Sequence, residues 1–382
     1  MRYFILITSL VIAFANVEAR QSGSFLIKDV NVFLPEGFVE DMDVLVEDGE
    51  IKQVGKNLAS DYPVVAGDGH TLLPGLVNAH VHSWVPYHLY NAAWNGVMYV
   101  HDMHSTNDSA EQLRGMRELA GYADFYGTGY AATVAEGHGT QFGYEVPVIG
   151  PDQNCYEFVD RQVAAGADHV KIIYEPAMPT LTIEQVDSLI SRTHEHGKKA
   201  VIHVSLADDA MDVMRLGADG LVHLWRDRQL TDAEMAEFAA SDIFVVPTAA
   251  VVERVLDLYR RMKSDRKIIS RVQMMDELKR AYDAGVTLLT GTDPPNFGLD
   301  YGESLHHEMV LLAESGIPIE EVLRAATVYP HTAYDYPVQA IAEGMPATFF
   351  LIAGDPREDI NDTKQIRMRW KDGALMEESK EY

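Results

Sequence analysis

The sequence contains little cysteine and little positive charge. Cys155 is the single cysteine among 382 residues, so no disulfide can form within the chain. Lysine and arginine together number 31 against 58 aspartates and glutamates, which gives a formal net charge of -27 at pH 7. Nucleic acid and anionic membrane surfaces would repel a protein of this charge, so neither is expected as a partner.

Long hydrophobic runs are also absent beyond the N-terminus. No later stretch approaches the roughly 18 uninterrupted apolar residues that a spanning helix needs. Residues 1–19 combine a basic start, an apolar run over residues 3–15 and the sequence Val-Glu-Ala at 17–19, a pattern typical of a secretory signal peptide. We predict cleavage after Ala19 and a periplasmic or secreted mature protein that lies outside the membrane.

Both ends of the mature chain have β-strand patterns. The segment MDVLVEDGEIKQVG alternates apolar and polar residues around a turn at Asp48-Gly49, which is typical of a hairpin. Near the C-terminus, ATFFLIAGDP and QIRMRWKDGALM repeat this chemistry. We therefore predict one small β-sandwich built from residues 20–74 and 345–382.

The residues between these ends, 75–344, alternate apolar runs with helical periodicity. The intervening segments, such as IEQVDSLISRTHEHG, read as amphipathic helices closed by glycine. Successive apolar runs lie about 30 residues apart, the length of a strand-helix unit. Eight such units predict an α/β fold of the (β/α)8 TIM-barrel type. A doubly wound open sheet is the alternative, but no G-x-G-x-x-G sequence follows a predicted strand. The predicted strands are 75–80, 96–102, 127–136, 167–174, 199–205, 219–224, 242–248 and 285–293.

Polar side chains interrupt or close several of these strands near their C-terminal ends. They are His80, His82, Lys171, His203, His223 and Asp293. Strand ends surround one mouth of a barrel, and residues two apart, such as His80 and His82, point to the same side. The pattern predicts that all six converge. A second His-x-His pair, His194 and His196, ends a predicted helix and is expected on the opposite side.

The chemistry of this set points to metal ions. Neutral imidazoles and a carboxylate are good ligands for zinc, manganese or iron. A lysine ammonium is not a ligand, but burial beside a cation would deprotonate Lys171. A neutral amine can add CO2 to form a carbamate with two oxygens, which can bridge two metal ions. We therefore predict that Lys171 is carboxylated.

These motifs resemble those of a known family. GLVNAHVH, HVKII, VIHVS, LVHL and LLTGTD, framed by VLVEDGEIKQVG and MRWKDG, are similar to the metal-dependent amidohydrolase superfamily. GVMYVHDM, EGHGT and GESLHHEMVLLAESGIPIEEVLRAAT resemble its imidazolonepropionase-like and Xaa-Pro dipeptidase-like branch. The resemblance extends over nearly the whole mature chain.

The resemblance implies a site with two divalent metal ions, expected to be zinc. His80 and His82 would bind one ion together with Asp293, His203 and His223 would bind the other, and carboxylated Lys171 would bridge them. The implied reaction is hydrolysis of an amide bond in a small molecule, with Asp293 as general base and acid. His138 is the expected donor to the substrate carbonyl, and the expected contacts to the rest of the substrate are Tyr174, Tyr130 and Tyr144.

Several alternatives stay open. Xaa-Pro dipeptides and N-acyl amino acids are the leading substrate classes, and an esterase or lactonase would use the same site. A mononuclear deaminase of the same fold and a non-catalytic metal- or ligand-binding protein are the remaining candidates. The sequence also leaves open whether the chain forms a homo-oligomer and what His101, His306 and His307 do.

Overall fold

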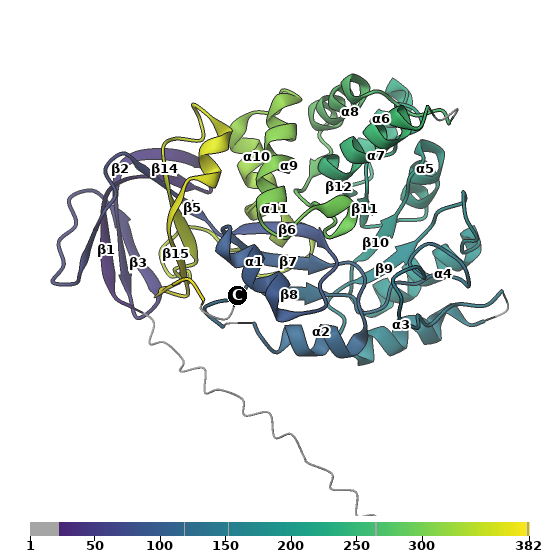
Figure 1. Ribbon diagram of the computed structural model, residues 1–382, viewed down its shortest axis with the longest axis horizontal. Helices are drawn as coiled ribbons and strands as arrows, with labels where there is room; N and C mark the ends of the chain where they lie inside the picture. Colours follow the sequence, from purple (N-terminus) through teal and green to yellow (C-terminus); the bar gives the residue numbers. More distant parts are fainter. Residues whose placement is uncertain (1–22, 118, 152, 264–265, 380–381) are drawn as a thin grey trace, which may run out of the picture.

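The computed structural model describes residues 23–117, 119–151, 153–263, 266–379 and 382 (Figure 1). The predicted signal peptide and its cleavage site at Ala19 lie outside the described residues. Among the described residues, no helix combines the length and the hydrophobicity needed to span a bilayer.

Strands from both ends of the chain share one eight-stranded sheet at one end of the molecule (Figure 1). The first five are β1 (Phe25–Leu34), β2 (Gly37–Glu47), β3 (Glu50–Gly55), β4 (Val64–Ala66) and β5 (His70–Pro74). The last three are β14 (Phe349–Ala353), β15 (Ile366–Lys371) and β16 (Ala374–Leu375). The order is β16-β15-β14-β5-β1-β2-β3, with β4 beside β1.

The expected hairpin turn is present, because Asp48 and Gly49 have φ values of 49° and 86° between β2 and β3. Strand β14 pairs antiparallel with β5, so Leu351 lies opposite Leu72. The two ends of the chain thus meet in one sheet. A division of this sheet into the two layers of a sandwich stays a prediction, as do the predicted domain boundaries.

Parallel strands occupy the middle of the chain, in two sheets. The first holds β6 (Leu76–Val81), β7 (Val97–Asp102) and β8 (Asp124–Gly127). The second holds β9 (Val170–Ile173), β10 (Ala200–His203), β11 (Gly220–Val222), β12 (Phe244–Val246) and β13 (Thr287–Leu288). The predicted α/β class with parallel strands is confirmed.

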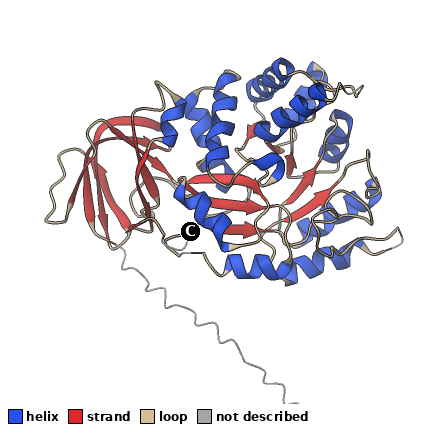
Figure 2. Cartoon of the chain, in the orientation of Figure 1, coloured by secondary structure: helices blue, strands red, loops and turns tan. Residues whose placement is uncertain are grey.

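Helices alternate with these strands and lie outside them (Figure 2). They are α1 (Pro86–Trp94), α2 (Asn107–Arg114), α3 (Cys155–Ala164), α4 (Ile183–Glu195), α5 (Ala207–Arg215), α6 (Asp232–Ala239), α7 (Ala249–Arg261), α8 (Arg271–Ala284), α9 (Glu303–Glu314), α10 (Ile319–Ala325) and α11 (Val328–Ala333). Two short 3-10 helices, η1 (Asn296–Gly298) and η2 (Ile360–Lys364), complete the described elements.

Backbone hydrogen bonds connect the two parallel sheets at both edges. On one side, Ala79 N donates to Thr290 O at 2.9 Å, and Asp293 N donates to His80 O at 2.8 Å. On the other side, Ala132 N donates to Lys171 O at 2.8 Å. The segments after β13 and β8 therefore lie against β6 and β9, which brings the ends of both sheets to a common region.

Two predicted strands differ from the structure. The third was expected over 127–136, but β8 is Asp124–Gly127, and the apolar residues that follow contribute a single bridge at Ala132. Gly129, with a φ of 69°, turns the chain there and prevents a regular strand. The eighth was expected over 285–293, but β13 has two residues. The predicted helix ends are confirmed, since Gly197 and Gly285 follow α4 and α8 with positive φ.

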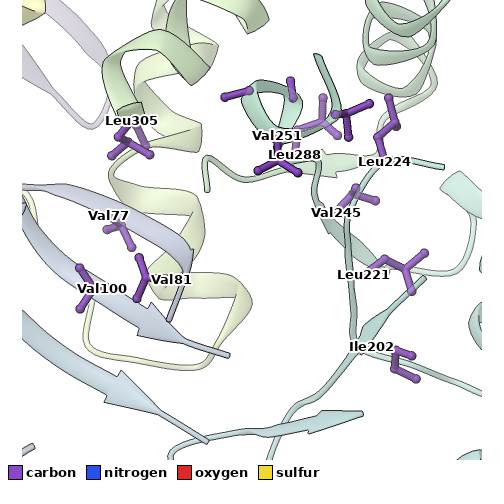
Figure 3. Packing of buried hydrophobic residues seen from close by; sticks show 14 of the residues in the cluster. Val77, Val81, Val100, Ile202, Leu221, Leu224, Val245, Val251, Leu288 and Leu305 are labelled. Atoms are coloured by element: carbon purple, nitrogen blue, oxygen red, sulfur yellow. The ribbon is translucent and has the colours of Figure 1, made fainter. Parts of the chain in front are cut away.

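Branched aliphatic side chains fill the space between strands and helices. Figure 3 shows residues of both parallel sheets together with Val251 of α7 and Leu305 of α9. Burial of each such side chain contributes about 1.5 to 3 kcal/mol. This packing holds the strand ends in place, and the candidate site is at these ends.

Candidate metal centre

The six predicted residues line one cavity of about 340 Å³. They come from four strands or the residues directly after them, and from the segment after a fifth strand: His80 in β6, His82 just beyond it, Lys171 in β9, His203 at the end of β10, His223 after β11 and Asp293 after β13. All six are buried. The structure therefore brings the whole set together, as the barrel argument predicts.

His80, His82 and Asp293 form the tightest group. The Nε2 atoms of His80 and His82 lie 3.3 and 3.0 Å from Asp293 Oδ1. Each of the three offers one ligand atom within 4.8 Å of the others, a spacing that can hold a metal ion. Asp293 has a φ of 59°, and such a left-handed conformation in a residue other than glycine costs about 1 kcal/mol or more and is often found at functional sites.

The hydrogen bonds of His82 and the burial of His80 fit a metal-binding role. His82 Nδ1 donates to the carbonyl oxygen of His104 at 3.1 Å, which fixes the ring with Nε2 facing Asp293. His80 Nδ1 is buried without a hydrogen-bond partner. Burial lowers the pKa of His80 to about 3, so its ring is neutral at pH 7. Neutral imidazoles beside a carboxylate are a donor set that suits zinc.

His203 and His223 form a second pair beside the first. Their ring centroids are 4.9 Å apart, and the His223 ring is also 4.9 Å from that of His80. Burial holds the pKa of both well below 6.5, so both are neutral. His223 Nδ1 is 2.5 Å from Thr248 Oγ1, which directs its Nε2 away from Thr248.

Lys171 and Asp293 provide the charges of the centre. Burial lowers the pKa of Lys171 to about 7, although Asp293 and Asp102 oppose this shift. A neutral amine is therefore accessible near neutral pH, which fits a lysine that reacts with CO2. Burial would raise the pKa of Asp293, but His80 and His82 hold it well below 3.8, so the carboxylate is ionised.

Of the four predicted substrate contacts, only His138 lines the cavity. Its ring stacks on that of His203 with the centroids 4.5 Å apart. Tyr174 follows Ile173, which lines the cavity, so strand alternation directs Tyr174 to the other face. The ring centroids of Tyr130 and Tyr144 lie 6.4 and 5.7 Å from that of His104. His104 lines the cavity, whereas the two tyrosines do not.

Sequence reasoning missed three charged residues of the cavity, Glu175, Arg226 and Arg266. Glu175 Oε2 lies 3.4 Å from His203 Nε2 and 4.0 Å from a terminal nitrogen of Arg226. Arg226 also donates to Ser205 Oγ at 2.6 Å. The period of two along Lys171, Ile173 and Glu175 would have identified the glutamate, because all three line the cavity.

The other histidines are held elsewhere. His194 pairs with Asp219 at 2.8 Å and His196 with Asp160 at 2.7 Å, away from the cavity lining, as predicted for the second His-x-His pair. His101 is buried beside Tyr334, with ring centroids 4.4 Å apart. His306 bonds Thr363 and the carbonyl of Asn95, and His307 pairs with Glu253. These contacts are structural.

Comparisons with known proteins point to one family. The model of the amidohydrolase family matches residues 71–376. Curated proteins match over short segments. A 5-methylthioadenosine/S-adenosylhomocysteine deaminase of Pyrococcus furiosus is 51% identical over 41 residues, 10% of each chain. A dihydroorotase of Mycobacterium tuberculosis is 38% identical over 99 residues, 23% of this chain and 22% of that protein. The chain thus spans less than a quarter of these curated relatives.

Solved structures are similar over nearly the whole chain. A Xaa-Pro dipeptidase with methionine bound in its active site has a TM-score of 0.79 and 22% identity, covering 93% of this chain and 100% of that one. A prolidase complexed with N-methylphosphonate-L-proline has a TM-score of 0.75 and 18% identity, covering 93% and 100%. The ochratoxinase of A. niger has a TM-score of 0.77 and 17% identity, covering 93% and 96%. At these identities the likeness establishes the fold.

Proposed function

This chain belongs to the amidohydrolase family, and we propose that it is a binuclear metal-dependent hydrolase that cleaves amide bonds of small molecules. The observation that carries this proposal is the convergence of four histidines, one lysine and one aspartate on a single buried cavity. Amides of proline and N-acyl amino acids are the proposed substrate classes. The N-terminal signal pattern supports a proposed periplasmic or secreted location.

The strands are proposed to close into one barrel around this cavity. The hydrogen bonds of Ala79 with Thr290 and of Ala132 with Lys171 support this closure, because they join the two parallel sheets at both edges. The amidohydrolase fold of the solved relatives gives the same support. A closed barrel would place the six side chains at its C-terminal mouth.

The ligand set divides into two halves. His80, His82 and Asp293 would hold one metal ion, and His203 and His223 would hold the second. A carbamate on Lys171 would supply one oxygen to each. Two divalent ions, proposed to be zinc, would polarise the substrate carbonyl and lower the pKa of an attacking water.

Asp293 moves the proton. Its Oδ1 contacts His80 and His82 and accepts a hydrogen bond from Asn296 at 2.9 Å, which leaves Oδ2 for proton transfer. Because the carboxylate is ionised, it accepts a proton from the attacking water and donates it to the leaving amine.

His138 orients the substrate. Burial lowers the pKa of His138, so its ring is neutral at pH 7 and one ring N–H can donate to the carbonyl oxygen. Its stacking on His203 holds the ring over the cavity.

Metal analysis of the purified protein tests the proposal. We expect about two zinc equivalents per chain, and about one after Lys171→Ala, with activity partly restored by short carboxylic acids. A matched control replaces His194 and His196 with alanine, because this His-x-His pair lies outside the cavity lining, and both equivalents should remain. One equivalent in the wild type with ammonia release would instead identify a deaminase. Two equivalents without turnover of any amide, ester or lactone would identify a binding protein.

A further inference from the structure

One side of the cavity is an apolar wall formed by helix α7. Five of its residues line the cavity: Val251, Val252, Val255, Leu258 and Tyr259. The spacing i, i+1, i+4, i+7 and i+8 places them along one face of the helix. Apolar side chains cannot polarise a carbonyl group, so this wall is suited to contact with an apolar part of a ligand.

This apolar wall begins at the metal centre and leads outward. Thr248, the residue before α7, contacts His223 at 2.5 Å, so the first turn of the helix lies beside the proposed ligands. With a rise of about 1.5 Å per residue, the wall from Val251 to Tyr259 extends over about 12 Å. A group attached to a carbonyl at the metals can therefore follow the helix towards the mouth of the cavity.

The wall is held rigidly. Glu308 of α9 accepts hydrogen bonds at 2.8 Å from the backbone N–H groups of both Ala249 and Ala250, at the N-terminus of α7. Val251 (Figure 3) and Val252 also belong to the hydrophobic core. The inner end of the apolar surface is thus anchored by α9 and by the core.

Apolar residues continue to the mouth. Leu258 of α7, Phe297 of η1 and Met178 of the loop after β9 line the cavity and have exposed fractions of 41%, 50% and 43%. A bound apolar group of sufficient length would cover these side chains and remove their surface from water.

The charged side chains of the cavity lie beside the metal centre and at the outer end of the wall. Glu253 of α7 is bound by Arg271 and His307 and faces away from the cavity lining. Glu175 and Arg226 lie at the ends of β9 and β11, and Arg266 lies over the ring of Tyr259, at the outer end of the wall, 5.8 Å from its centroid. The inner part of the wall thus meets its occupant without a charge.

We propose that the substrate is an N-acyl amino acid whose acyl group is long and apolar and lies along α7. This inference rests on the proposed amide hydrolysis and selects between its two substrate classes. With the acyl side of the substrate along α7, the α-ammonium group of a dipeptide would lie next to the scissile carbonyl against Val251 and Val252 and lose its hydration there. In an N-acyl amino acid the same space receives methylene groups, and the leaving group carries its carboxylate to the side of Arg226.

The test uses the zinc-loaded enzyme and a series of N-acetyl, N-butyryl, N-hexanoyl and N-octanoyl derivatives of one amino acid. We expect kcat/KM to rise about fourfold for each added methylene that the wall buries. Val255→Asp should reduce the ratio of octanoyl to acetyl kcat/KM at least tenfold. Leu258→Asp changes a more exposed position of the same face and should act in the same direction, which covers a failure of the first variant to fold.

Val272→Asp is the matched control, because Val272 is a valine of α8 that is 77% exposed and outside the cavity lining. The ratio of octanoyl to acetyl kcat/KM of this variant should equal that of the wild type. An equal kcat/KM along the whole series would overturn the inference while amide hydrolysis stands, and so would faster turnover of a Xaa-Pro dipeptide than of the octanoyl substrate. An enzyme with two zinc ions that hydrolyses no amide would overturn the proposed function itself.

Discussion

Replacement of Glu308 by glutamine should make the stability of the protein less dependent on pH. Glu308 is fully buried, and burial raises the pKa of its carboxyl from 4.5 to about 7, although the N–H groups of Ala249 and Ala250 oppose this shift. Between these two pH values the folded protein retains a proton that the unfolded chain releases. The free energy of unfolding therefore falls as the pH rises from about 4.5 to about 7.

The size of this loss follows from the shift. One pKa unit corresponds to about 1.4 kcal/mol, so ionisation of Glu308 removes about 2 to 3 kcal/mol between pH 5 and pH 8. Glutamine is neutral at every pH and keeps one oxygen for an N–H group of α7. The stability of Glu308→Gln relative to the wild type should increase by about this amount over the same range.

Urea unfolding followed by circular dichroism at pH 5, 6, 7 and 8 measures the difference. Glu303→Gln is the control, because Glu303 is an exposed glutamate in the first turn of the same helix. It should leave the pH dependence of the wild type unchanged. If wild type and Glu308→Gln lose stability in parallel with rising pH, the buried carboxyl is not the cause, and the reasoning fails.

Three further results are expected at the metal centre. Thr248→Val removes the hydroxyl beside His223 Nδ1 and should weaken zinc binding about 10- to 100-fold in competition with a chelator, whereas an unchanged affinity would refute the orienting role of Thr248. Asp293→Asn cannot accept the proton and should lower kcat at saturating zinc by about 100-fold or more, and a pH-rate profile with an unchanged acidic limb would contradict this role. Chelator treatment should abolish activity, and zinc should restore it; activity that persists in metal-free protein would exclude the proposed mechanism.

The candidate centre was predictable because it depends on strand ends. Apolar runs locate strands, and the parallel arrangement places their C-terminal ends at one mouth, so His80 and Asp293 could be brought together although 213 positions separate them along the sequence. The same reasoning separated His80 and His82 from His194 and His196, two pairs with identical spacing. Position in the fold, rather than the motif, distinguishes them.

Loop residues were predicted less well, for a physical reason. Apolar periodicity carries no information on how a loop turns. Tyr130 and Tyr144 lie in the loop after β8, and the strand β8 itself begins earlier and ends earlier than predicted. The left-handed conformation of Gly129 redirects the chain there. Tyr174 is different, since alternation along β9 already excludes it from the face that carries Lys171.

Contacts between distant segments were beyond sequence reasoning. Glu308 of α9 caps the N-terminus of α7. Nothing in the sequence pattern of α9 indicates from which backbone N–H groups the Glu308 carboxylate accepts hydrogen bonds. The apolar face of α7 was likewise not predicted to line a cavity. A helix that faces a cavity and a helix that faces a core have the same periodicity.

The pairing of β5 with β14 has a consequence for synthesis of the chain. Leu72 of β5 is synthesised long before its partner Leu351 of β14. At about 5 to 20 residues per second, the ribosome needs roughly 15 to 55 s to produce the partner strand. During this interval the edge of β5 exposes its backbone N–H and C=O groups and a row of apolar side chains to other nascent chains. A translational pause or a truncation before residue 349 would prolong that exposure, so aggregation during expression should depend on the last strands of the protein rather than on the segment that carries the candidate metal centre.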